Sequence, residues 1–219
     1  MAGLVAAVAG PASTRASTSS VAPLVALSFD DGPDSRWTPQ VLDVLARYRA
    51  HATFFAVGRN AIAHPDLVRA ELAAGNEVGD HTFDHADLSQ LTPRAMGAEI
   101  DRGAQALEAV GAPAPRLFRP PYGHANPVVY RAAATRSYRT VLWSVSLEHF
   151  VDHAPVPMGV NELVARVRPG AVILAHDGGV PDRSRTMKAL PLLLQQLEAR
   201  GYRVVAVSDL LGETGRSAT

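Results

Sequence analysis

The 219-residue sequence contains no cysteine, so neither a disulfide framework nor a thiolate metal site can form. Its formal net charge is zero, and it has no basic run interleaved with aromatic residues, which argues against nucleic-acid binding. No apolar stretch reaches the length of a membrane span. These absences leave a globular protein, in which any metal must be held by histidine, aspartate or glutamate.

The residues that are present fit one sizeable domain, because 47% of the chain is hydrophobic and residues 23–211 are enough to form a core. Residues 1–22 differ, with a small apolar segment followed by one rich in serine, threonine and alanine. This order is typical of a secretory-signal remnant and predicts a secreted or cell-surface protein; the alternative is a disordered tail. Residues 212–219 are predicted to be a C-terminal tail, and we expect a monomer.

Strand-like and helix-like segments alternate about seven times along the chain. Helix-start signals follow the apolar runs at Thr38-Pro39, Thr92-Pro93 and Asn126-Pro127. Such alternation predicts an α/β fold with parallel strands covered by helices, and the length favours a distorted (β/α) barrel of about seven units in a single domain. The sequence predicts strands at 24–27, 53–57, 77–79, 117–118, 140–143, 171–175 and 204–207. It predicts helices at 38–48, 61–74, 92–110 and 160–167, one more helix that begins at 126, and a longer one that ends at 200.

Polar residues stand at the carboxyl ends of these predicted strands. Asp30 and Asp31 follow the first strand, His81 the third, Arg119 the fourth and His176 the sixth. The carboxyl ends of the strands in a parallel barrel share one face, where active sites are built. We therefore expect these distant residues to converge.

His81 and His85 are four residues apart, which on a helical turn places both imidazoles on one face. Two histidines and one carboxylate are the ligand set of a catalytic zinc site, which leaves a position open for water. We predict that Asp31, His81 and His85 bind a divalent metal, with zinc as the first candidate and cobalt or nickel as alternatives. Each motif alone is more often a simple turn or a surface pair, so the hypothesis depends on their convergence.

Other residues have candidate catalytic roles. Asp30 is left free to act as a base, and Arg119, in a segment made rigid by two prolines, can pair with it. The backbone N–H of Tyr122 can stabilise a developing oxyanion. His176 has the pKa range of a general acid. The alternative interpretations are a structural turn with a surface salt bridge, and a structural histidine.

Taken together, Ser28–Pro33, His81–His85, Arg119–Tyr122 and Leu174–His176 resemble the motifs of the NodB-like polysaccharide deacetylases, carbohydrate esterase family 4, over about residues 23–211. The resemblance implies a distorted barrel, a divalent metal, and removal of acetyl groups from N-acetylated glycans such as chito-oligosaccharide or peptidoglycan, or from O-acetylated xylan. It also implies these roles: Asp30 as the base, Asp31, His81 and His85 as metal ligands, His176 as the acid, Arg119 as the residue that steadies the base, Tyr122 as the oxyanion donor, Leu174 as a wall of the acetyl pocket, and Pro121, Trp143 and Phe150 as further substrate contacts.

One segment departs from the family pattern, because His149-Phe150 stands where the family has Asp-Trp. The family's aspartate orients and charges the acid histidine, and His149 cannot supply that negative charge. Glu148 and Asp152 are the candidates to replace it. Phenylalanine in place of tryptophan keeps an aromatic wall but removes an N–H donor.

Two rival functions stay open. One is a metal-dependent hydrolase of non-sugar cyclic amides, since similar barrels handle cyclic ureides and imides. The other is a catalytically weak glycan-binding protein, although the intact set of candidate catalytic and metal-binding residues argues against it.

Overall fold

The computed structural model describes residues 22–180 and 182–212, so the two predicted tails, apart from residues 22 and 212, lie outside the described residues. Within the described chain, eight strands form one sheet in the order β5-β4-β3-β2-β1-β7-β6, with β8 beside β1, and every pair is parallel. The strands are β1 (Leu24–Asp30), β2 (Thr53–Ala56), β3 (Glu77–Asp80), β4 (Leu117–Phe118), β5 (Arg139–Thr140), β6 (Val145–Ser146), β7 (Val172–His176) and β8 (Arg203–Val205).

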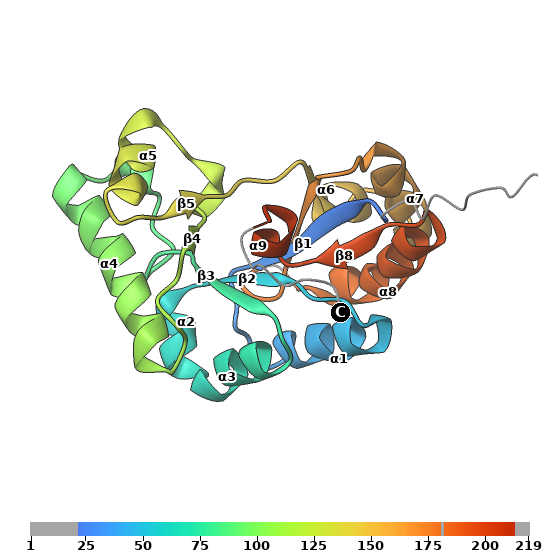
Figure 1. Ribbon diagram of the computed structural model, residues 1–219, viewed down its shortest axis with the longest axis horizontal. Coiled ribbons are helices and arrows are strands. Elements are labelled where there is room, and N and C mark those ends of the chain that lie inside the picture. Colours follow the sequence, from blue (N-terminus) through green and yellow to red (C-terminus); the bar gives the residue numbers. More distant parts are fainter. Residues whose placement is uncertain (1–21, 181, 213–219) are drawn as a thin grey trace, which may run out of the picture.

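Helices surround the curled sheet: α4 and α5 lie at one end beside β4 and β5, and α6, α7 and α8 lie at the other (Figure 1). The end strands β5 and β6 do not pair with each other, so the sheet is the incomplete barrel that the sequence predicted. No described helix is long and apolar enough to cross a membrane. The helices are α1 (Thr38–Tyr48), α2 (Gly58–Ala63), α3 (Pro65–Ala73), α4 (Pro93–Ala109), α5 (Pro127–Ala134), α6 (Leu147–Val151), α7 (Val156–Arg166), α8 (Ser184–Ala199) and α9 (Val207–Leu210), with short 3-10 turns at Leu88–Gln90 and Pro121–Gly123.

The central strand β1 shows why the site lies where it does. Its alternate residues Val25, Leu27 and Phe29 are fully buried in the largest core cluster, which α1, α7 and α8 complete. Burial of each such side chain is worth about 1.5–3 kcal/mol. Because side chains alternate along a strand, Ser28 and Asp30 share the other face, which lies inside the barrel. That face becomes polar toward the carboxyl end of β1.

Two predicted helix features were wrong in detail. The single helix expected at 61–74 is two helices, α2 and α3, because Pro65 has no N–H to continue a helix and instead begins α3. Thr38 is not the N-cap of α1; Trp37 holds that position without a side-chain bond. The Thr38 hydroxyl instead donates to Asp177 at 2.5 Å, which satisfies one oxygen of a fully buried carboxyl group.

The prediction of a strand at 140–143 was also wrong, because only Thr140 of that segment is in a strand. The next strand, β6, begins at Val145. The Arg119 side chain explains the interruption. Its Nε donates to the Val141 carbonyl at 3.0 Å and its Nη2 to the Leu142 carbonyl at 3.3 Å. These carbonyls therefore accept hydrogen bonds from a guanidinium group instead of from a neighbouring strand.

Candidate active site

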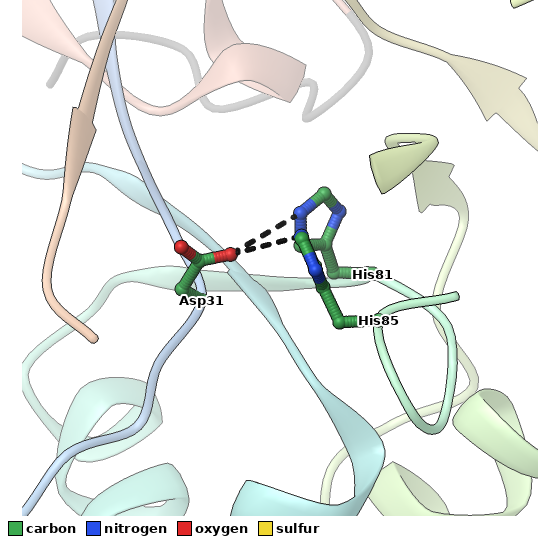
Figure 2. A group of neighbouring side chains, drawn as sticks. All are labelled: Asp31, His81 and His85. Atoms are coloured by element: carbon green, nitrogen blue, oxygen red, sulfur yellow. Dashed lines mark ion pairs between the residues drawn. The ribbon is translucent and has the colours of Figure 1, made fainter. Parts of the chain in front are cut away.

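Asp31, His81 and His85 converge at the carboxyl ends of β1 and β3 (Figure 2). Asp31 Oδ1 lies 3.1 Å from His85 Nε2 and 3.7 Å from His81 Nε2. Tetrahedral zinc with bonds of about 2.1 Å needs donor atoms roughly 3.4 Å apart. The three side chains therefore fit a divalent cation and leave further coordination positions free.

Backbone contacts orient the His81 ring toward this site. Its Nδ1 lies 2.6 Å from the Arg119 carbonyl oxygen. A carbonyl only accepts hydrogen bonds, so we assign the proton to Nδ1, which leaves the Nε2 lone pair free on the side of Asp31. Burial lowers the pKa of His81 and outweighs the nearby carboxylates, which raise it. His81 therefore presents the neutral imidazole that a metal requires.

The segment His81–His85, which we call the metal loop, is not the helical turn that the four-residue spacing predicted. Thr82 has a left-handed φ of 66°, which is incompatible with a continuous helix. Two carboxylates hold the loop: Asp80 accepts from the Thr82 N–H at 2.8 Å, and Glu99 of α4 accepts from the Asp84 N–H at 2.9 Å. The two imidazoles therefore meet because of tertiary hydrogen bonds and not because of helical periodicity.

Asp30 is buried beside the metal loop and is paired with Arg119. Arg119 Nη1 donates to Asp30 Oδ1 at 2.6 Å and to the Ser28 hydroxyl at 2.9 Å, and the guanidinium lies 4.1 Å from the centre of the Phe55 ring. The other carboxylate oxygen, Oδ2, lies 3.7 Å from His81 Nε2. This charge-assisted bond fixes the orientation of the Asp30 carboxylate and leaves Oδ2 on the side of His81.

Asp30 and Asp31 are adjacent in sequence yet line the same pocket. In a continuous strand, neighbouring side chains point to opposite faces. Asp31 leaves the strand with a φ of 73°, and this left-handed conformation turns its side chain toward the histidines. Burial raises the pKa of Asp31, but the His85 hydrogen bond and the nearby histidine charges outweigh it and lower the pKa to about 2.

His176 ends β7 and is paired with a carboxylate that the sequence only suggested. Its Nδ1 lies 3.2 Å from Glu148 Oε2, and Glu148 Oε1 accepts from the His176 backbone N–H and from the Thr186 hydroxyl. Burial alone would lower the pKa of His176, but Glu148 raises it above its ordinary value. Burial would raise the pKa of Glu148, yet the pairing lowers it. Asp152, the other candidate, faces Arg185 at 3.9 Å.

A pocket of about 580 Å³ connects these groups. Arg119 lies beneath its wall and is fully buried, whereas Tyr122 is 60% exposed at the rim, with its ring 4.7 Å from that of His85. Of the residues proposed from the sequence, the pocket is lined by Asp30, Asp31, His81, His85, Tyr122, Trp143, Leu174 and His176.

Two proposed substrate contacts, Phe150 and Pro121, do not line this pocket. Phe150 packs on the largest core cluster, and the Arg166 guanidinium lies 5.1 Å from its ring centre, because α6 turns this side chain toward α7. Pro121 is buried at the start of the turn that carries Tyr122. Phe150 and Pro121 therefore lie outside the pocket wall, to which Tyr122 and Trp143 contribute aromatic rings.

Several residues of the pocket wall were not predicted from the sequence. Arg59, Asn60 and Arg183 line the pocket, and Asn60 and Arg183 contact Asp31. Arg59 and Asn60 stand in the first turn of α2, and Arg183 immediately precedes α8. No local pattern distinguishes these two arginines from the other arginines of the chain, and only the tertiary structure reveals their position.

Comparisons with known proteins agree on one family. A protein-family model described as polysaccharide deacetylase matches residues 18–141. A peptidoglycan-N-acetylglucosamine deacetylase from Bacillus cereus is 41% identical over 189 residues, which cover 86% of this chain and 88% of that protein. A chitooligosaccharide deacetylase from Bradyrhizobium sp. is 36% identical, with 85% and 90% covered. The solved family 4 carbohydrate esterase from Streptomyces lividans, in complex with acetate, has a TM-score of 0.76 at 35% identity and covers 83% of this chain and 91% of its own.

Proposed function

Because the chain belongs to the polysaccharide deacetylase family, we propose that it is a metal-dependent hydrolase that removes acetyl groups from N-acetylglucosamine units of a glycan. The substrates of its relatives point to chito-oligosaccharides or the glycan strands of peptidoglycan. The observation that best supports the proposal is the pocket in which two histidines and a carboxylate adjoin an arginine-paired carboxylate and a glutamate-paired histidine.

Asp31 Oδ1, His81 Nε2 and His85 Nε2 would hold the divalent ion, with zinc as the first candidate. When bound, such an ion supplies Lewis-acid chemistry, because it polarises the acetyl carbonyl and lowers the pKa of water. The protein prepares the site beforehand. His81 is kept neutral with its proton on Nδ1, and Asp31 is kept ionised at neutral pH.

Asp30 acts as the general base that takes a proton from the attacking water. Arg119 binds Asp30 Oδ1, so Oδ2, on the side of the metal ligands, receives this proton. The backbone N–H of Tyr122 stabilises the oxyanion that develops on the acetyl group. Leu174, which is buried in the pocket wall, packs against the acetyl methyl group.

His176 acts as the general acid that protonates the leaving amine. Its Nδ1 faces Glu148, so Nε2 delivers the proton to the substrate. By raising the pKa of His176, Glu148 keeps the ring protonated closer to neutral pH, as an acid catalyst requires. We propose that Glu148 takes the place of the aspartate that the family pattern has at position 149.

Acetate release tests this function. The substrates are an N-acetylated chito-oligosaccharide, a peptidoglycan glycan fragment, acetylxylan and a small cyclic amide, each with and without chelator. We expect release from the first two, which chelator abolishes and zinc restores. Binding of the glycans at full metal loading without acetate release would favour a glycan-binding protein, and hydrolysis of the cyclic amide alone would favour the other hydrolase.

Asp30→Asn tests the assignment of the base. We expect kcat to fall by about 10²–10⁴-fold, because the amide cannot take the proton, while bound metal is retained. Asp43→Asn, at an exposed position of α1, is the matched control and should keep full activity. An active Asp30→Asn variant with normal metal content would remove Asp30 from this role.

A further inference from the structure

A buried arginine that no motif predicted faces the metal ligand Asp31. Arg183 immediately precedes α8, is only 5% exposed and lines the pocket. Its Nε donates to the Gly178 carbonyl at 2.8 Å, and its Nη2 lies 3.4 Å from Asp31 Oδ2. A guanidinium buried to this degree needs a counter-charge, and Asp31 supplies it.

The surroundings of Asp31 hold it in an unusual conformation. Its left-handed φ of 73° is rare for a residue with a side chain. The Asn60 side-chain amide donates to the Asp31 carbonyl at 2.8 Å, which anchors the backbone. Gly179 packs against the carboxylate so closely that a Cβ there would lie 2.6 Å from Oδ2. Oδ2 is therefore enclosed by Gly179 and Arg183, while Oδ1 faces the two histidines.

We propose that Arg183 is a positioning residue, which holds Asp31 Oδ2 so that Oδ1 alone is presented to the divalent ion. This inference rests on the metal site of the proposed function. The guanidinium charge repels a cation, but the hydrogen bond keeps the Asp31 carboxylate in the ligating orientation before the ion arrives. Such outer partners of metal ligands typically contribute about 10–100-fold to metal affinity.

Zinc affinity of the full chain, stripped with chelator and measured by competition with a chelating dye, tests the role of Arg183. We expect Arg183→Met to weaken zinc binding by about 10–100-fold. Arg183→Lys keeps the charge but loses the rigid guanidinium whose Nε and Nη2 contact the Gly178 carbonyl and Asp31, so we expect an intermediate loss. Arg200→Met is the matched control, because this arginine lies at the far end of α8, where its side chain donates to the Val164 carbonyl of α7. The zinc affinity of this variant should match that of the unmodified chain.

A second measurement separates positioning from a general effect on folding. Thermal unfolding of the stripped chains identifies a variant that has lost its fold. If Arg183→Met is such a variant, the zinc affinity of Arg183→Lys tests the proposal instead. Cobalt(II) loaded in place of zinc reports the coordination through its visible absorption spectrum. We expect this spectrum to change in Arg183→Met, because Oδ2 becomes free to join Oδ1, and to stay unchanged in Arg200→Met.

A folded Arg183→Met variant that binds zinc as tightly as the unmodified chain, or more tightly, would overturn the inference, because the guanidinium would then act only as a repelling charge. An unchanged cobalt spectrum would overturn the statement that Oδ1 alone is presented. An unmodified chain that binds no zinc or cobalt would overturn the proposed metal site itself, and this outcome is distinct from the other two.

Discussion

Glu148 places a negative charge beside His176, although this chain lacks the aspartate that the family pattern has at position 149. The segment offers His149 where the resemblance expects an aspartate, yet a carboxylate still reaches Nδ1 of His176 at 3.2 Å. The first turn of α6 makes this possible, because it directs Glu148 inward, where the Thr186 hydroxyl and the His176 backbone N–H also bind it. The histidine therefore keeps an anionic partner although the position that supplies it has moved along the chain.

Replacement of Glu148 should alter the pH dependence of catalysis. Glu148→Gln keeps the shape but removes the negative charge that raises the pKa of His176, so that pKa should fall. An acid catalyst must be protonated, so the alkaline limb of the kcat profile should move to lower pH. The measurements are kcat against pH and an NMR titration of His176, with Asp152→Asn as the control that leaves both unchanged. An alkaline limb that stays in place in Glu148→Gln would show that another group tunes the acid.

At the scale of the element, helix α4 determines the shape of the metal loop. Glu99 in this helix accepts from the Asp84 N–H. One turn later, Gly103 allows the helix to approach so closely that a Cβ there would overlap Asp80 Oδ1 and lie 2.9 Å from the Thr82 carbonyl carbon. The helix and the loop that carries both histidines therefore form one packed unit.

Two glycines of α4 give a paired test of this packing. Gly103→Ala should destabilise the chain by about 1–3 kcal/mol and weaken metal binding, because the added methyl pushes Asp80 and the metal loop away. Gly97→Ala is the control: its methyl would meet the Arg136 guanidinium, at 2.6 Å from Nη2, and not the metal loop. Asp101 and the Ala132 carbonyl hold this guanidinium, which must shift, and the gain in helix propensity of up to about 1 kcal/mol should offset that cost, so stability should change little. Urea unfolding and zinc titration measure both effects, and equal stability of the two variants would contradict the close approach at Gly103.

At the scale of the whole molecule, the largest core cluster lies away from the candidate metal site, so we expect the fold not to depend on the ion. The largest core cluster joins β1 and β7 to α1, α7 and α8, and the side chains that form it lie on the face of β1 opposite Asp30. The described sheet consists of parallel strands held by their own ladders. The ion would thus add stability to a structure that is already formed, in contrast to small zinc domains that are unfolded without metal.

Metal removal should therefore separate activity from folding. Chelator should abolish acetate release but leave the far-UV circular dichroism spectrum unchanged. Zinc at about 100 times its Kd should raise the free energy of unfolding by about 2.7 kcal/mol, because it binds the folded state only. Thermal unfolding at a series of zinc concentrations measures this increase. The control is chelator already saturated with zinc, which cannot remove the ion from the protein. Loss of the helical signal on chelation would show that the ion holds the fold together.

Local patterns in the sequence were sufficient to predict much of this protein. Apolar periodicity predicted the parallel sheet and most helices, because it reflects which face of each element is buried. The N-caps Thr92 and Asn126 were also predicted from local sequence, because a cap side chain accepts a hydrogen bond from a nearby backbone N–H. Both side chains do so in the first turns of α4 and α5. The order of motifs at the strand ends was also enough to predict that Asp30, Asp31 and the histidines would share one pocket.

Only the tertiary structure decided how those residues are oriented. Arg183 and Asp31 are separated by 152 positions, and Glu148 rather than Asp152 pairs with His176, because contacts between distant elements select the partner. The same holds for the ring of Phe150, which packs on the core and not in the pocket. A local pattern records which side of an element is buried, but it carries no information on which distant side chain lies opposite, and the charge and orientation of catalytic groups depend on that neighbour.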